Sequence, residues 1–289
     1  MRQVSVGRAL GESWSFAAVA YGLGIVVLGV NLLTPLYGLY IRRWDLNAGD
    51  VALVFASYAF VVIPLLLMSG AIAGKFGYRR ALAGGLAAAL LSAVFLMCAG
   101  GLPLLIAARV AQGAAVGIFN GLAVAVMTGL HGGRDPRKAA QAAALAVTAG
   151  NAGGPLLAGG LGEYSAQPQL VYLAYGTLVL AGLIALLSVR LGRLAAAPAG
   201  FRIPALGPEG RRGFLTAAAT SFAAWSIVSL YMSLIPSYAD RMIGVSSLAA
   251  AGAASAFILG VSALSQHLMR KVPLSVMLAC GLALSAVGL

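Results

Sequence analysis

The chain has little charge and little cysteine for its 289 residues. Only 9% of the residues are Asp, Glu, Lys or Arg, whereas a soluble domain carries about 25%, so the sequence could not cover a water-soluble fold with charged side chains. The two cysteines, Cys98 and Cys280, both lie in apolar stretches. They are expected to pack as small apolar residues, and nothing in the sequence suggests a disulfide framework.

The sequence also lacks the motifs of familiar catalytic and metal sites. It contains no HExxH, no GxSxG and no CxxC pair, which would indicate a zinc peptidase, a serine hydrolase or a zinc site. All seven acidic residues lie in loops or at the ends of apolar stretches, so an intramembrane carboxylate pair is missing as well. We therefore expect no enzymatic activity, no metal and no cofactor.

Long apolar stretches dominate what is present. Hydrophobic residues make up 61% of the chain and form nine stretches near the length of about 20 residues that spans a bilayer. Lipid leaves backbone polar groups no outside partner, so each stretch must be a helix. The sequence predicts an all-α polytopic membrane protein, with spans at Ser15–Tyr40, Val51–Ala73, Ala81–Ala99, Leu102–Leu130, Ala139–Leu161, Leu170–Val189, Phe214–Ile235, Leu248–Leu268 and Val272–Leu289.

Basic residues in the loops predict the orientation. With the N-terminus in the cytoplasm, 15 of the 19 Lys and Arg residues lie on the inner side, three lie outside, and Arg109 lies within a span. Such an excess of basic residues marks the cytoplasmic side. Topology thus accounts for the net charge of +12, and no nucleic-acid partner is expected. The preference for Arg over Lys suggests a bacterial protein of the cell membrane.

The longest loop divides the spans into two groups. Residues 190–213 carry five arginines and three prolines and are expected to form a cytoplasmic linker. Residues 1–189 would then form a six-helix bundle and residues 214–289 three helices of a second bundle. Because the last stretch is short and the second group holds half as many spans as the first, we expect a fragment or an early-terminated form of a twelve-span protein.

Glycine and proline are concentrated in the fifth span, "TAGNAGGPLLAGG". Gly150 and Gly154 are four residues apart and so share one helix face, and Gly159 follows Pro155 at the same spacing. Small residues at this interval let two helices approach closely in lipid, and Pro155 can kink the helix. Two interpretations remain open, a functional interface or ordinary small-residue packing.

Two further segments carry polar residues. "GAIAGKFGYRR" joins the second and third spans, where Gly70 and Gly77 would allow a tight turn and Lys75, Arg79 and Arg80 would fix topology and hold helix ends. The simpler alternative is a plain basic loop.

The fourth span contains Arg109, Gln112 and Asn120 on one helical face. An arginine within a span is costly and indicates function. The alternative is a structural hydrogen-bond knot between helices.

Together these three segments resemble the major facilitator superfamily of secondary transporters, in order, position and sidedness. The first basic loop resembles its signature loop, "RVAQGAAVG" its helix 4 motif, and "GNAGGPLLAGG" a helix 5 motif associated with antiporters. The chain departs from the family at Gly74, where an aspartate is usual, at Tyr78, where a basic residue is usual, and at Ala158, where a glycine is usual. The missing aspartate puts in doubt the latch that the family uses to hold its outward-facing state.

The resemblance implies a major facilitator fold whose first bundle is complete and whose second is partial. It further implies a monomer in a lipid bilayer that moves a small-molecule substrate, with protons as the coupling ion in efflux of drug-like or metabolite molecules. An importer or facilitator, or a non-transporting fragment, remains an alternative. Asp50 and Glu163 are the acids nearest the membrane, but we expect both to be solvated.

Amide, hydroxyl and aromatic side chains within the spans are candidates for the substrate cavity, because such transporters bind near the bilayer midplane between their halves. The alternative is that the amides satisfy one another between helices. The proposed cavity residues are Asn31, Thr34, Arg109, Gln112, Asn120, Asn151, Trp225 and Ser229.

Overall fold

The structure, a computed structural model, describes residues 2–130, 136–164, 167–189, 191 and 247–268, together with short pieces within 210–227 and 272–284. Throughout these ranges the regular elements are helices, which confirms the predicted all-α class. Trp225 and Ser229, and most of the predicted spans Phe214–Ile235 and Val272–Leu289, lie outside the described residues.

Most predicted spans correspond to one observed helix each, with ends that differ by a few residues. Five segments of the described chain are long and apolar enough to cross a membrane, the first of them Ser13–Trp44. α6 is not among these five, because its glycines, Asn151 and Pro155 make it less apolar. The elements are α1 (Arg2–Asn31), η1 (Thr34–Leu36), α2 (Tyr37–Trp44), α3 (Ala48–Phe76), α4 (Tyr78–Met97), α5 (Leu102–Leu130), α6 (Pro136–Tyr164), α7 (Gln169–Ser188) and α9 (Leu248–Leu268).

The first span differs from the prediction of one continuous helix over Ser15–Tyr40. The α-helix stops at Asn31, a short 3-10 turn follows at Thr34–Leu36, and α2 begins at Tyr37. Pro35 lies in the first turn of this 3-10 segment. Proline has no backbone N–H and cannot continue the hydrogen-bond pattern of the preceding helix, which favours a break at this point.

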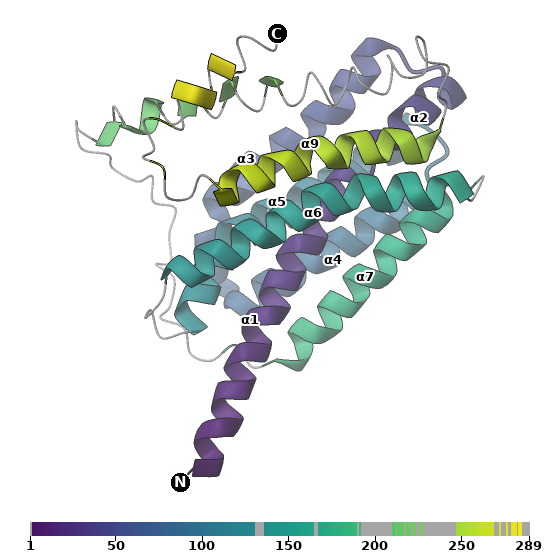
Figure 1. The fold of residues 1–289 in the computed structure, drawn as a ribbon. Helices are drawn as coiled ribbons and strands as arrows, with labels where there is room; N and C mark the ends of the chain where they lie inside the picture. Colours follow the sequence, from purple (N-terminus) through teal and green to yellow (C-terminus); the bar gives the residue numbers. More distant parts are fainter. Residues whose placement is uncertain are drawn as a thin grey trace.

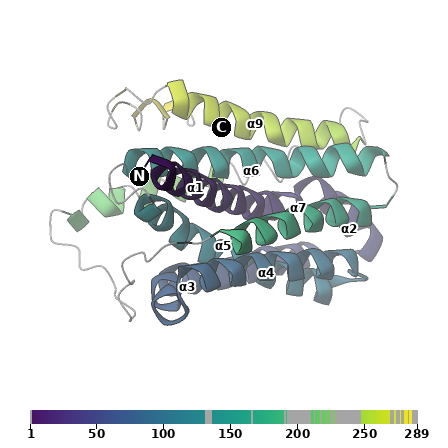
Figure 2. The same cartoon turned by 90° about the horizontal axis from the view of Figure 1, so that it is seen from below.

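The helices form a bundle around α5 (Figures 1 and 2). α5 packs against α3, α4 and α1, and α7 packs against α4 and α1. α6 contacts α1 on one side and α9 on the other. In Figure 2, α9 lies along α6 on the side of the molecule away from α3 and α4. α9 therefore joins the bundle mainly through α6, with further contacts to η1.

Large apolar side chains cover much of the outer surface as well as the interior. Phe119, Tyr172 and Tyr175 are fully buried between helices, whereas Phe60 and Ile63 on α3 are exposed. A soluble monomer seldom exposes large contiguous apolar surfaces. The exposed face of α3 suits contact with lipid or with other apolar helices.

Candidate functional site

The break in α1 leaves two backbone carbonyl groups without helical partners. In a continuous helix the oxygens of Gly29 and Val30 would accept hydrogen bonds from the amides four residues later. Because α1 ends at Asn31, these carbonyls belong to its last turn, where such partners are missing. In lipid, unsatisfied carbonyl groups are costly and need partners from within the protein.

Side chains of α5 supply those partners. Arg109 donates from Nη1 to the Val30 oxygen at 3.2 Å and to Gln112 Oε1 at 2.9 Å. Gln112 in turn donates from Nε2 to the Gly29 oxygen at 2.9 Å. Both side chains are buried, with 3% of Arg109 and 2% of Gln112 exposed. In this conformation the two residues form a hydrogen-bond knot that ties α5 to the broken end of α1.

Aromatic rings of α3 complete the surroundings of the Arg109 guanidinium. Its Cζ lies 5.0 Å from the centre of the Tyr58 ring and 5.4 Å from that of Phe55. Rings at such distances stabilise a buried cation. The Arg109 Nε and the Tyr37 hydroxyl are both buried and have no hydrogen-bond partner in the described part of the chain.

The amides of Asn31 and Asn151 meet between α1 and α6. Asn31 Nδ2 donates to Asn151 Oδ1 at 2.9 Å and also lies 3.3 Å from the Val27 oxygen. Thr34, at the start of η1, is half-buried. The structure therefore brings together two of the predicted cavity residues. Their amides bind each other between two helices, which was the alternative to a role in the substrate cavity.

The predicted polar face of α5 is divided. Arg109 and Gln112 point into the bundle, whereas Asn120 is exposed and makes no hydrogen bond within the described residues. Asn120 therefore takes no part in the hydrogen-bond knot of Arg109 and Gln112. Asn120 lies about three helical turns from Arg109, or about 16 Å along the helix axis at 1.5 Å per residue, so it is too far along α5 to reach the end of α1.

The glycines of α6 lie at two different interfaces. A Cβ atom at Gly154 would lie 2.5 Å from the Leu28 oxygen of α1, and Gly150 approaches the same helix at Gly24. A Cβ atom at Gly159 would instead lie 2.6 Å from the Leu248 oxygen of α9. The backbones are too close for any larger residue at these positions. The segment that resembles the antiporter motif thus packs against both α1 and α9.

Pro155 lies between these two contacts and does not end the helix. It is buried, and α6 continues through it to Tyr164. Its carbonyl group borders Gly252 of α9, which in turn approaches Gly159. Gly160, by contrast, has open space around it, so the close packing is specific to one face of α6.

The basic loop forms a tight turn between α3 and α4. Gly77 is the single residue between the two helices, and its φ of 84° lies in the region that glycine favours. Arg79 donates a hydrogen bond to the carbonyl oxygen of Leu187, in the last turn of α7. Lys75 Nζ lies 5.3 Å from the centre of the Phe76 ring, and Gly70 has open space around it.

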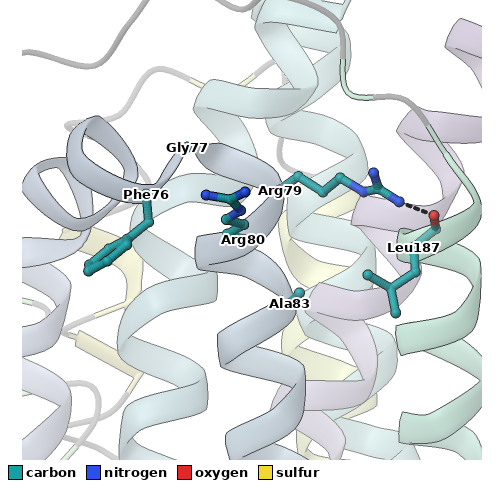
Figure 3. A pocket seen from close by; sticks show the side chains of 6 residues that line it. All are labelled: Phe76, Gly77, Arg79, Arg80, Ala83 and Leu187. Atoms are coloured by element: carbon teal, nitrogen blue, oxygen red, sulfur yellow. Dashed lines mark hydrogen bonds between the residues drawn. The ribbon is translucent and has the colours of Figure 1, made fainter.

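A hollow of about 400 Å³ lies beside this turn (Figure 3). Figure 3 shows the two arginine side chains leaving α4 in different directions, with Arg79 reaching α7. The turn therefore links α3, α4 and α7. The residues that line the hollow are Phe76, Gly77, Arg79, Arg80, Ala83 and Leu187.

Both acids that were expected to be solvated lie at the surface, Glu163 exposed and Asp50 half-buried, and each also caps a helix. Asp50 and Asn47 form a reciprocal capping box at the start of α3, with two bonds of 3.0 Å. Glu163, at the end of α6, accepts hydrogen bonds from the Ser247 hydroxyl at 3.0 Å and from the Ala249 amide at 3.1 Å.

The role of Ser247 was not predicted from the sequence. A hydroxyl residue before an apolar run is a helix-start signal that could have identified it, but no local signal places Glu163 beside it.

Comparisons with known proteins agree with this architecture. A family model described as Major Facilitator Superfamily matches residues 15–289. No curated protein sequence matches the chain. Among solved structures, a bacterial homologue of the human lysosomal transporter Spinster, in an inward-facing and unoccupied conformation, has 19% identity and a TM-score of 0.63. The match covers 91% of this chain and 64% of that one, so the chain spans less than two thirds of that structure. At this identity the likeness concerns the fold.

Proposed function

The chain belongs to the major facilitator superfamily, and on this premise we propose that it is a secondary active transporter working by alternating access. The proposed reaction is efflux of small drug-like or metabolite molecules in exchange for protons. The protein would act as a monomer in the cell membrane, with its N-terminus in the cytoplasm. Residues 1–189, the linker 190–213 and residues 214–289 would be its two bundles and their connection.

The packing of α6 is the observation that carries this proposal. Gly150 and Gly154 hold α6 to α1 within the first bundle, whereas Gly159 holds it to α9, which belongs to the proposed second bundle. A contact made by backbone and small residues depends on close approach rather than on interlocked side chains. Such a surface supports the rocking of one bundle against the other that alternating access needs.

The break in α1 supports a binding region beside it. Interrupted helices near the midplane commonly form the binding sites of transporters, and here the break lies next to Asn31, Thr34 and the Arg109 knot. Asn120 and Asn151, with Trp225 and Ser229, complete the proposed lining. The buried positive charge of Arg109 favours neutral or anionic substrates over cations.

A transport assay tests this function. Cells lacking their own exporters would express the full-length protein, and efflux of a panel of fluorescent compounds would be followed with and without a protonophore. We expect export of at least one compound, abolished by the protonophore and reduced in Asn31→Ala and Arg109→Ala. Gly160→Ala, at a position with open space, is the control.

Each other result has a defined meaning. Export that survives the protonophore would replace proton coupling with facilitated exchange. Unchanged export in both the Asn31 and Arg109 variants would remove the proposed binding region. A protein that is correctly inserted but exports no compound, and takes none up, would overturn the transporter proposal.

A further inference from the structure

The end of α6 and the start of α9 are joined by a carboxylate. Ser247 caps α9, because its Oγ accepts from the Ala250 amide at 3.1 Å. Glu163 Oε2 accepts a hydrogen bond from the preceding amide, that of Ala249, at 3.1 Å, and a second one from the Ser247 hydroxyl at 3.0 Å. The first amides of a helix have no partners within it. Glu163 therefore completes the capping of a helix to which it does not belong.

The negative charge of Glu163 stabilises its contact with the start of α9. A helix N-terminus carries a partial positive charge, so a carboxylate is a favourable partner there. The hydrogen bond from the Ala249 amide, followed by that from Ser247, lowers the pKa of Glu163 below its usual value. The lowered pKa means that the ionised carboxylate is the form that prefers this arrangement.

Close backbone packing lies directly beneath the carboxylate. The two helices run antiparallel, with Gly159 against Gly252 and Gly162 beside Leu248. Glycine contacts bring the helices near each other but provide no charge that selects one alignment. Glu163 supplies that charge at the rim of the contact, where the two helix ends first separate if the bundles rock apart.

We propose that Glu163 is a positioning residue that holds the ends of α6 and α9 together and so favours the conformation closed on that side. With the N-terminus inside, that side is the outer one. This inference rests on the proposed alternating access. The outer side is then held closed by the contact between one carboxylate of α6 and the first turn of α9. Opening requires loss of both hydrogen bonds, and the open state then exposes the free amides of α9 to water.

A distance measurement in the full-length protein tests the proposal. Spin labels at Leu170→Cys on α7 and Ala253→Cys on α9, both exposed positions, would report the separation of the outer ends in lipid nanodiscs. Cys98 and Cys280, which are both exposed, would be replaced by serine. We expect Glu163→Ala to raise the ratio of long to short distances about threefold or more, since a charge and its hydrogen bonds at a helix end are lost.

Two matched variants separate the latch from general damage. Glu163→Gln keeps the shape and one acceptor but loses the charge, so it should give an intermediate ratio. Tyr164→Ala changes the neighbouring residue, which is 94% exposed, and should leave the ratio unchanged. If Glu163→Ala does not fold, Glu163→Gln carries the test.

The outcomes are independent of the transport assay. Distance distributions of Glu163→Ala and Glu163→Gln identical to that of the unsubstituted protein would overturn the latch, even if transport is observed. An equal shift in Tyr164→Ala would also overturn it, because the effect would not belong to the carboxylate. A shift confined to the Glu163 variants supports the latch even if no exported compound is found.

Discussion

Gln112 on α5 donates its side-chain amide to the carbonyl oxygen of Gly29 on α1, at 2.9 Å. The bond joins a residue in the middle of one helix to the last turn of another, where the helix has broken before Pro35. Arg109 makes the equivalent bond to the next carbonyl, that of Val30. The buried polar side chains of α5 thus donate hydrogen bonds to the carbonyl groups that the break in α1 leaves without helical partners.

Removing the Gln112 side chain should destabilise the bundle. Gln112→Ala leaves the Gly29 oxygen and the Arg109 guanidinium each short of one hydrogen bond, which costs about 1–3 kcal/mol for a buried group. The melting temperature in detergent, followed by the loss of helical circular dichroism, should fall. Asn120→Ala on the same helix removes an exposed amide and should leave it unchanged. Equal melting temperatures for the two variants would show that the knot contributes nothing to stability.

A methyl group on α6 should have different effects at two adjacent positions. Gly159→Ala places a Cβ atom 2.6 Å from the Leu248 oxygen of α9, so the helices must move apart, at a cost of about 1–3 kcal/mol. Gly160→Ala meets open space and should be neutral or slightly stabilising, since alanine favours a helix. Crosslinking between α6 and α9 measures the separation. Similar crosslinking in both variants would contradict the packing.

The positions of the helices could be predicted from the sequence better than the contacts between them. Apolar length alone identified α5 at Leu102–Leu130 and α9 at Leu248–Leu268, because lipid leaves a span no alternative to a helix. The break at Pro35 was not predicted. Proline alone does not determine whether a helix breaks, because Pro64 and Pro155 lie within continuous helices. Whether a helix breaks depends on which neighbours can satisfy the freed carbonyls.

The site was predicted in its residue types but not in its pairings. Spacing placed Arg109 and Gln112 on one face of α5, and the structure shows both buried there. Their acceptors on α1 are about 80 residues earlier, a separation that a single sequence does not encode locally. The capping role of Glu163 was not predicted for the same reason, because its partners Ser247 and Ala249 are more than 80 residues later in the chain.

The pair of Asn31 and Asn151 should couple α1 to α6. Interhelical hydrogen bonds between side chains in membranes contribute about 0.6 kcal/mol on average. Asn31→Ala and Asn151→Ala should each lower stability, and the double variant should cost less than the sum of the two. A double-mutant cycle on unfolding in mixed micelles gives this coupling. Strict additivity would mean that the 2.9 Å contact makes no net contribution.

The outer closure should weaken in acid. In the closed arrangement the bonds from Ala249 and Ser247 lower the pKa of Glu163 from its usual 4.5, and separation of the helix ends would restore it. A pKa lower in the closed state means that Glu163 favours closure fully above pH 4.5 and loses this contribution as the pH falls through the lowered value. The described elements packed there, η1 and the first turn of α9, carry no charged side chain.

The spin-label distances between residues 170 and 253 measure this dependence. On lowering the pH from 7 to 3 we expect the fraction of long distances to rise below pH 4.5 in the protein with Glu163 intact. Glu163→Gln cannot ionise, so its distances should stay constant over the same range, whereas Tyr164→Ala should follow the unsubstituted protein. A transition of the same size in Glu163→Gln would assign the acid response to a group other than this carboxylate.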